Sequence, residues 1–293
     1  MSARAHTWIE KLGHELPAND AQTKAFKLYC GEYWSVVREL PTVARKAGVA
    51  VQFWICSAGY GLISPDSEIR SYSATFCPQE PDCVTRGFNA DGRRAAAQEW
   101  WRRIAEWSGP RGNKVRSLTS LARKYPRTPL MLVASSDYLH ALEKDLDSAL
   151  DALSNPDLLL IVSAGTKSFG KFTDNLVPCS ARLQPVVGGT RASLNIRIAK
   201  LLLGRVRKTP LDMRHIRVEL GGLLKRQAPI QTYQRSVVSD RQVRSFIRLH
   251  AYKNGVVVSR SALLRKLRDS GKACEQSRFA NLYSQTVIDE NVA

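Results

Sequence analysis

Three short apolar runs, each followed by an amphipathic segment, constrain the fold of this chain most strongly. The runs are VAVQFWIC at 49–56, TPLMLVAS at 128–135 and DLLLIVSAG at 157–165. After the second run, leucines recur at helical spacing on one face: Leu139, Leu142, Leu146, Leu150 and Leu153. Buried strands that alternate with amphipathic helices are typical of parallel sheets. We therefore expect an α/β fold, with a largely parallel sheet sandwiched by helices.

Two further amphipathic segments belong to the same domain. Residues 89–107 predict a helix, and so does the segment that follows Gly188-Gly189 and ends near Gly204. All six tryptophans lie within the first 107 residues, as expected if the large core is formed by the first part of the chain. These features predict an α/β domain at 1–204.

The composition changes after residue 204. Residues 201–293 contain 18 Lys and Arg against 7 Asp and Glu, an excess of 11 positive charges. We interpret 205–235 as a basic connector and 236–293 as three short helices, the first two of which begin at serines and end at glycines. Three brief basic helices are typical of helix-turn-helix or winged-helix modules that bind DNA. The alternative is a helical cap that only stabilises the large domain.

The side chains expected to contact DNA are basic and amide residues of the second and third of these helices and the lysine between them. They are Arg260, Arg265, Lys266, Arg268, Lys272, Gln276 and Arg278.

The net charge favours a polyanionic partner. Forty-four Lys and Arg against 26 Asp and Glu leave +18, and the sequence pI is about 10.0. A merely solubilising surface is the alternative. No run of about 18 apolar residues is present, and the N-terminus lacks a compact apolar stretch of the signal-peptide type. We therefore expect a cytoplasmic protein that binds DNA and no membrane.

Cysteines and histidines give no metal or cofactor signature. The six cysteines include no CxxC pair, and the five histidines are far apart. In a reducing compartment free thiols are expected, while a disulfide or a metal site at Cys77 and Cys83 stays open. We expect no metal and no cofactor, with carboxylate-held magnesium as the remaining alternative.

The three strand ends share a change from apolar to small and hydroxyl residues. The segments are ICSAGYG, LVASSDY and LIVSAGTKS, which contain Ser57, Asp137 and Ser163. Ligands of open α/β sheets bind beyond the carboxyl ends of the strands, because loops there present backbone N–H groups. Serines after a strand are also common helix caps, which is the alternative for each of them.

Asp66 is the acid that stands out. It follows Pro65 in the loop after the first strand, close in sequence to Tyr60 and Tyr72. A carboxylate among aromatic rings can activate water or stabilise a developing cationic sugar, as in cleavage of a glycosidic bond. The alternative is that Asp66 only shapes the turn after Pro65.

The segment SAGYGLISPDSEIRSY at 57–72 resembles the signature of the peroxide-stress YaaA family and, in style, the catalytic part of archaeosine synthase. The matching residues are Ser57, Tyr60, Gly61, Leu62, Pro65, Asp66, Ile69 and Tyr72. VPCSARLQP at 177–185 is similar to a proline-cysteine motif of the synthase, although the residues after it depart from the pattern. The resemblance covers about residues 25–204 and implies an α/β domain that handles nucleobases.

Joined to a DNA-binding tail, such a domain resembles the prokaryotic antiviral DNA glycosylases, which excise modified bases from phage genomes. In an enzyme of this kind Asp66, Tyr60 and Ser57 are expected to be catalytic, and Tyr60 and Tyr72 are expected to stack on the base or orient it. Ser163 and Asp137 are expected to bind substrate. A base-exchange enzyme and a non-catalytic DNA-binding protein are the alternatives.

The glycine pair before the last helix of the domain completes the predicted site. Gly188 and Gly189 are expected to let a ligand approach the main chain closely. Arg191 and Asn195 follow one helical turn apart and are expected to meet a phosphate or a base edge. A solvated helix face is the alternative for this pair.

Overall fold

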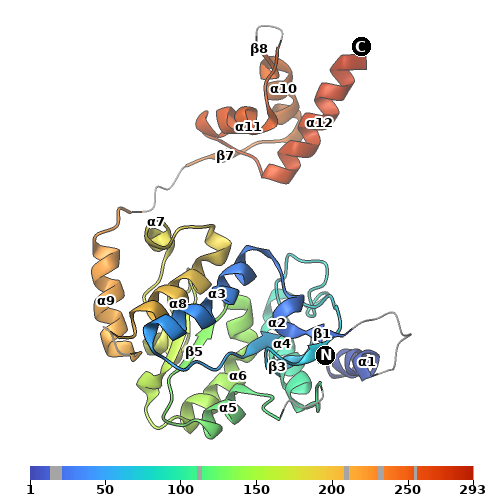
Figure 1. Cartoon of the computed structure of the whole chain (residues 1–293). Coiled ribbons are helices and arrows are strands. Elements are labelled where there is room, and N and C mark those ends of the chain that lie inside the picture. The colour runs from blue at the N-terminus through green and yellow to red at the C-terminus, as the bar shows by residue number, and fades with distance from the viewer. Residues whose placement is uncertain (14–21, 111–113, 208–210, 230–233, 254–255, 293) are drawn as a thin grey trace. The chain divides into compact units, whose positions relative to one another are not determined.

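The structure is a computed structural model, and it describes residues 1–13, 22–110, 114–207, 211–229, 234–253 and 256–292. The chain divides into two compact units, Met1–Pro229 and Ile230–Ala293. The first unit is a mixed α/β structure, and the second is built around three helices (Figure 1).

The first unit begins with α1 (Ser2–Gly13), β1 (Thr23–Lys24), α2 (Ala25–Leu28), α3 (Gly31–Ala47), β2 (Ile55–Ser57), β3 (Gly61–Ile63), β4 (Glu68–Ile69) and α4 (Ala90–Glu106). It continues with α5 (Leu118–Lys124), β5 (Leu130–Val133), α6 (Ser136–Ala152), β6 (Leu159–Val162), α7 (Gln184–Val187), α8 (Leu194–Arg205) and α9 (Met213–Lys225). Short 3-10 turns include η1 (Pro156–Leu158), η2 (Phe172–Asn175), η3 (Ala181–Leu183) and η4 (Arg191–Ser193).

Strands β5 and β6 form a parallel ladder at the centre of the first unit, with Leu130 opposite Leu159 and Val133 opposite Val162. All four residues of β6 are buried. Leu159 packs in the core that lies under α4, α5 and α6, whereas Leu160 packs in the core under α8 and α9. Because successive side chains of a strand point to opposite faces, helices cover this ladder on both sides.

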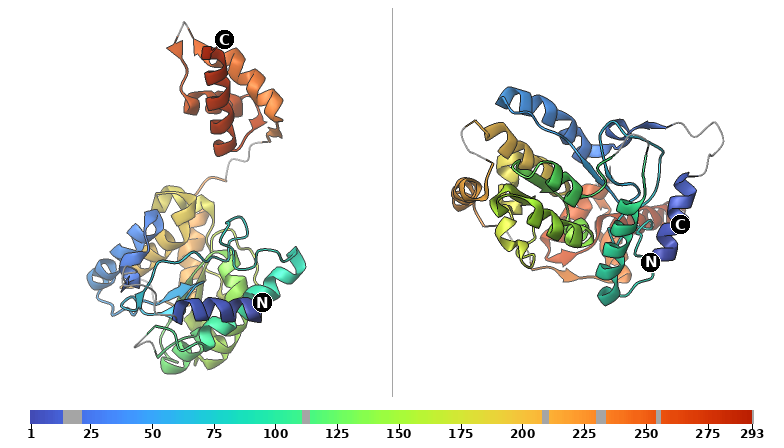
Figure 2. Two further views of the ribbon diagram at one scale, coloured as in Figure 1. Left: turned by 90° about the vertical axis from the view of Figure 1, so that its right-hand side faces the viewer. Right: turned by 90° about the horizontal axis from the view of Figure 1, so that it is seen from below.

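Helices α3 and α8 pack side by side, as the views in Figures 1 and 2 show. Val36 and Leu40 of α3 are buried against Ile196 and Leu203 of α8. Helix α6 buries Leu139, Leu142 and Leu146 on one face, which confirms the leucine pattern of the sequence. The mixed α/β class is therefore confirmed.

A single, largely parallel sheet is not confirmed. In the described part of the first unit the strands pair only in twos: β5 with β6 in parallel, and β2 with β3 and β1 with β4 in antiparallel. Of the predicted strand at 49–56, only the end pairs, because the chain turns back after Ser57. Gly61 has φ +73° there, and the turn makes β2 pair with its own continuation.

The predicted connector at 205–235 contains the helix α9. Asp212 caps it by accepting the backbone N–H of His215, and Met213, Ile216 and Leu220 are buried in the same core as Leu160. The compact first unit therefore continues to Pro229.

The second unit contains β7 (Ser236–Val237), α10 (Asp240–His250), β8 (Tyr252–Lys253), β9 (Val256–Val257), α11 (Arg260–Asp269), β10 (Lys272–Ala273) and α12 (Gln276–Val292). Val243, Ile247, Leu263, Leu267 and Phe279 form its separate core. Ser239 and Ser259 accept backbone N–H groups at the starts of α10 and α11, so both serine caps are confirmed. The β8–β9 hairpin separates α10 from α11, and β10 separates α11 from α12; a helix-turn-helix is not confirmed.

Candidate functional site

A chain of three hydroxyl groups lies where β2 ends. The Ser57 Oγ atom is 2.7 Å from the Tyr72 hydroxyl, which is 2.8 Å from the Tyr29 hydroxyl. Ser57 Oγ also accepts the backbone N–H groups of Gly59 and Tyr60 at 3.2 and 3.0 Å. The structure thus brings together Ser57 and Tyr72, which were both predicted as site residues, and Tyr29 joins them from the segment before α3.

The hydrogen-bond inventory of these groups sets the direction of the chain. A serine oxygen has two lone pairs, and both are used by the two backbone N–H groups. Ser57 therefore donates its own hydrogen to Tyr72, and Tyr72 donates to Tyr29. The Tyr29 hydroxyl then donates its hydrogen to neither Ser57 nor Tyr72. Tyr29 is therefore the end of the chain that can donate a hydrogen bond to a ligand.

Half-buried aromatic groups surround the hydroxyl chain. Burial raises the pKa of Tyr29 to about 12, and burial also raises the pKa of Tyr72 well above the usual range. The Trp34 ring stacks on Tyr29 with centroids 4.5 Å apart, and the Trp8 indole donates to the Gly59 carbonyl oxygen at 2.9 Å. All three hydroxyls of the chain therefore stay protonated near neutral pH and act as hydrogen-bonding groups.

Arg116 holds this strand-end turn against α4. Its guanidinium donates to the carbonyl oxygens of Tyr60, Leu62, Ile104 and Trp107 at 2.6, 3.0, 3.1 and 3.1 Å. Burial lowers the pKa of Arg116 to about 10, so it remains charged at neutral pH. The β2–β3 turn that carries Ser57 is fixed to the end of α4 by these four bonds.

Asp137 and His140 lie one turn apart at the start of α6, directly beyond β5. Burial raises the pKa of Asp137 and lowers that of His140. The buried Nδ1 atom of His140 has no hydrogen-bond partner among the residues that the structure describes. Half-buried acid and base groups with pKa values displaced by burial are typical of proton-transfer sites.

Tyr138 of α6 lies near the hydroxyl chain. It follows Asp137 in α6, and the pKa of its buried phenol is raised by burial and by the neighbouring phenol of Tyr72. Tyr33 of α3 donates a long hydrogen bond, 3.5 Å, to the carbonyl oxygen of Val133 at the end of β5. Phenols from three separate segments therefore gather at the ends of β2 and β5.

Asp66 lies apart from this group, on an exposed turn before β4. The Asp66 side chain is 79% exposed, and its carboxylate pairs with Lys24 at 2.8 Å. An exposed ion pair of this kind has little effect on stability. The geometry favours the interpretation of Asp66 as a turn residue.

Tyr60 is packed into the core. Its side chain is 4% exposed, and its hydroxyl oxygen accepts the backbone N–H of Arg70 at 3.1 Å. Its ring packs edge-on against Tyr72, with centroids 5.2 Å apart. The Tyr60 ring therefore supports Tyr72 of the hydroxyl chain by packing against it. Stacking of Tyr60 on a base would require the core to open.

Ser163 and Asn195 lie together at the ends of β5 and β6. Asn195 donates to the Ala134 carbonyl oxygen at 2.9 Å and accepts the Ala164 backbone N–H at 2.6 Å. Ser163 is 2% exposed and lies 3.0 Å from the Thr166 hydroxyl. Asn195 thus clamps the two strand ends, which is a positioning role and not the predicted contact with a base edge.

Gly188 and Gly189 have φ +70° and +72°, and a Cβ atom at Gly189 would lie 2.1 Å from the Arg197 side chain. The Arg197 side chain therefore fills the space beside Gly189 that a ligand was predicted to occupy. Glu32 accepts hydrogen bonds from Thr190 and Ser193, which lower the pKa of Glu32 to about 2. Arg191 beside them is exposed.

The predicted DNA-contacting residues of the second unit differ in their surroundings. Arg278 is bound to Asp240 and to the Val238 carbonyl oxygen, and Arg268 donates to the Cys274 carbonyl oxygen. Both have structural roles. The other predicted contacts are less engaged: Arg260, Arg265 and Gln276 are exposed, Lys266 donates to a histidine, and Lys272 lies against an aromatic ring.

The six cysteines are free thiols, including Cys77 and Cys83, which resolves the question of a disulfide between these two. Within the described ranges, no group of three or more His, Cys, Asp or Glu side chains is placed to hold a metal ion. No helix in the same part of the chain is long and apolar enough to cross a membrane.

Comparisons with protein-family models, with curated proteins and with solved structures found no match for this chain. Its function has to be inferred from its own residues.

Three residues of the site were missed by sequence reasoning. Tyr138 follows a strand end that was recognised, so the same rule would have included it. Tyr29 lies about 40 positions before Tyr72, and no local pattern joins the two. His140 carries no signal of its own in the sequence, because the five histidines are far apart, and the charge near it is that of an aspartate one helical turn earlier.

Tyr72→Phe tests the hydroxyl chain. Removal of the central hydroxyl takes one partner from the buried Ser57 hydroxyl and one from the half-buried Tyr29 hydroxyl, and we expect a loss of about 1–2 kcal/mol in the free energy of unfolding. Tryptophan fluorescence during urea unfolding reports this change in the first unit alone, because all six tryptophans lie there. Tyr125→Phe, outside the chain, is the matched control; an equal stability of the two variants would contradict the network.

Proposed function

We propose that this chain is a DNA glycosylase, which hydrolyses the bond between a modified base and its sugar and leaves an abasic site. The role in defence against phage is part of the proposal and is supported by the resemblance of residues 57–72 to base-handling families. The substrate is DNA, held by the positive charge of the chain.

The observation that carries the proposal is the group of side chains at the ends of β2 and β5. The hydroxyl chain at the end of β2 supplies a hydrogen-bond donor, Tyr29. Asp137, a half-buried carboxylate whose pKa is raised by burial, lies just beyond β5 on the helix that carries Tyr138. Cleavage of a glycosidic bond requires a carboxylate near the sugar and a donor to the departing group. Phenol rings around them match the need of a flipped base for stacking partners.

The chemistry assigns one role to each group. A water molecule adds its oxygen to C1′ of the sugar as the bond from C1′ to the base nitrogen breaks. Asp137 accepts the proton that the water gives up and stabilises the positive charge that develops on the sugar. Tyr29 donates a hydrogen bond to the leaving base, which takes up one proton from solvent, and Asp137 then releases the proton of the water to solvent, so that the products are free base and an abasic site.

Binding of DNA is supported by the charge distribution. The second unit contributes 11 Lys and Arg against 5 Asp and Glu over residues 230–293. Phosphate contacts by such cations give most of the affinity of DNA-binding proteins. This part of the proposal needs no helix-turn-helix, because basic surfaces of other architectures also follow the phosphate backbone.

The test is release of free base. Purified protein is incubated with DNA from heavily modified phages and with unmodified DNA, and free bases and abasic sites are measured. We expect both products from modified DNA in equal amounts. Incorporation of an added free base into intact strands would identify a base-exchange enzyme instead, and binding without either product would identify a non-catalytic protein.

DNA binding is expected to depend steeply on salt. A chain of net charge +18 that neutralises several phosphates releases their counterions, and we expect the affinity to fall at least about tenfold between roughly 50 and 200 mM salt. Fluorescence anisotropy with a labelled duplex measures this. A flat response would contradict a nucleic-acid partner.

A further inference from the structure

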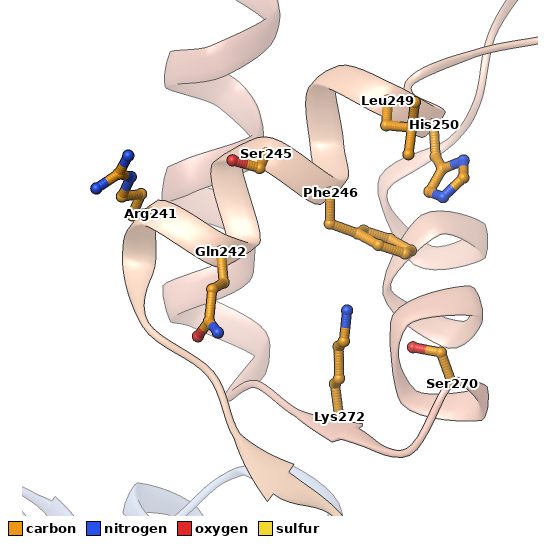
Figure 3. Close-up of a pocket in the computed structure, with 8 residues that line it drawn as sticks. All are labelled: Arg241, Gln242, Ser245, Phe246, Leu249, His250, Ser270 and Lys272. Atoms are coloured by element: carbon orange, nitrogen blue, oxygen red, sulfur yellow. The ribbon is translucent and has the colours of Figure 1, made fainter.

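A pocket of about 500 Å³ opens on the second unit beside α10 (Figure 3). Residues of α10 form one side, while Ser270 at the end of α11 and Lys272 of β10 form the other. The lining contains two strong cations, Arg241 and Lys272, and no acid.

The two cations are not neutralised by the protein. Arg241 is exposed on the first turn of α10, and neither it nor Lys272 forms an ion pair in the part of the unit that the structure describes. The Lys272 Nζ atom lies 5.8 Å from the centroid of the Phe246 ring. Arg278 of the same unit, in contrast, is fully engaged by Asp240. The pocket is therefore an unneutralised cationic site, which favours an anionic ligand.

Two neutral side chains add donors to the pocket. The Gln242 Oε1 atom accepts the Ser239 backbone N–H at 2.8 Å, which leaves the amide hydrogens of Gln242 for a ligand. Lys266 lies 3.1 Å from His250 Nδ1 and donates to it, so the imidazole proton is on Nε2. Burial, together with Lys266 and Lys272, lowers the pKa of His250. Both groups suit the oxygens of an anion.

The pocket also has an apolar side. Leu249 is 75% exposed, and the Phe246 ring is half-buried next to it. A simple ion has no use for these groups, whereas the sugar and base of a nucleotide do. A volume of about 500 Å³ is within the usual range for small organic ligands.

We propose that this pocket holds one nucleotide of a DNA strand, its phosphate at Lys272 and its sugar and base against Phe246 and Leu249, with Arg241 at the rim of the pocket facing a neighbouring phosphate. The proposal rests on the proposed function, because it takes DNA as the ligand. It places the DNA-contacting surface on α10 and β10, whereas the sequence had placed most contacts on α11 and α12.

The test compares variants of the full chain by fluorescence anisotropy with a labelled 12-nucleotide strand and the matching duplex. The double variant Arg241→Gln/Lys272→Gln is expected to bind at least about tenfold more weakly at about 100 mM salt. The slope of the logarithm of the binding constant against the logarithm of the salt concentration is expected to fall by the amount that corresponds to about two phosphate contacts. The matched control is Arg123→Gln/Arg127→Gln, which removes the same charge from exposed positions of the first unit. We expect a loss of no more than about twofold for the control.

A second comparison separates a nucleotide site from a site for small anions. Leu249→Ser is expected to weaken binding of the 12-nucleotide strand several-fold and to leave competition by inorganic phosphate unchanged. Equal losses for the pocket and control variants would overturn the proposal, and so would competition by phosphate at the concentration at which the strand competes.

Failure of this inference and failure of the proposed function give different results. If the pocket variants lose DNA affinity but the parent chain releases no base, the pocket stands and the glycosylase proposal fails. If the parent releases base and the pocket variants bind and react like the parent, the glycosylase proposal stands and the pocket proposal fails.

Discussion

Asp137→Asn is expected to lower the rate of base release on the order of 10²-fold or more, because a positioned acid or base contributes that much to such reactions. The amide keeps the size of the carboxylate but neither accepts a proton nor carries charge. The rate of abasic-site formation under single-turnover conditions measures the effect. DNA affinity is expected to stay at the parent level, since Asp137 belongs to the reaction and not to phosphate binding.

Asp66→Asn is the matched control for this experiment. Both are Asp-to-Asn changes in the first unit, but the Asp66 side chain is 79% exposed and pairs with Lys24. We expect a rate within about twofold of the parent, because exposed ion pairs have small effects. If Asp66→Asn abolishes base release and Asp137→Asn does not, the two roles are reversed.

Asp137→Asn is also expected to change how the rate depends on pH. Asp137 acts in its ionised form, and burial raises its pKa above the ordinary value for aspartate. As the pH falls through this raised pKa, Asp137 takes up a proton and kcat/KM falls, so the acid limb of the profile lies at higher pH than an exposed aspartate would give. In Asp137→Asn this limb is expected to disappear, leaving a low and flat rate.

Removal of residues 230–293 is expected to weaken DNA binding on the order of 10²-fold at about 100 mM salt. The remaining unit, Met1–Pro229, keeps 33 Lys and Arg against 21 Asp and Glu, a net charge of +12. A large loss would therefore report where the contacts are made and not how much charge the chain carries. Anisotropy titrations of the two chains with the same duplex measure the difference.

The control for the truncation is the fold of what remains. The two units have separate cores, with Phe279 and Leu267 in one and Leu160 and Leu142 in the other. Unfolding of the first unit, followed by tryptophan fluorescence, should therefore be unchanged by the truncation. A folded Met1–Pro229 that binds the duplex as tightly as the full chain would contradict DNA binding by the second unit.

Helices were predictable from the sequence because their signals are local. The leucines of α6 recur every three or four residues, and the serines before α10 and α11 precede amphipathic runs, so spacing and caps were enough. The sheet was less predictable, since strand pairing depends on partners far along the chain. The run at 49–56 has the composition of a buried strand, but the turn at Gly61 makes its end pair with β3.

The candidate site was predictable only in part, for the same reason. Strand-end rules found Ser57 and Asp137, which directly follow or end a strand. Asp66 was chosen for its aromatic neighbours in sequence, yet the chain between it and Tyr72 runs through β4, and Lys24 meets it on an exposed turn. Tyr29 reaches Tyr72 only through the fold of the whole segment.

The four carbonyl oxygens bound by Arg116 have a consequence for the dynamics of the site. Two of them belong to the β2–β3 turn and two to the last turn of α4 or just beyond it. If this turn opened locally, the half-buried guanidinium of Arg116 would lose hydrogen-bond acceptors, so opening of the turn alone costs free energy. The amides of Tyr60 and Leu62 are therefore expected to exchange with deuterium only when the whole first unit unfolds, whereas those of the exposed turn at Asp66 exchange early.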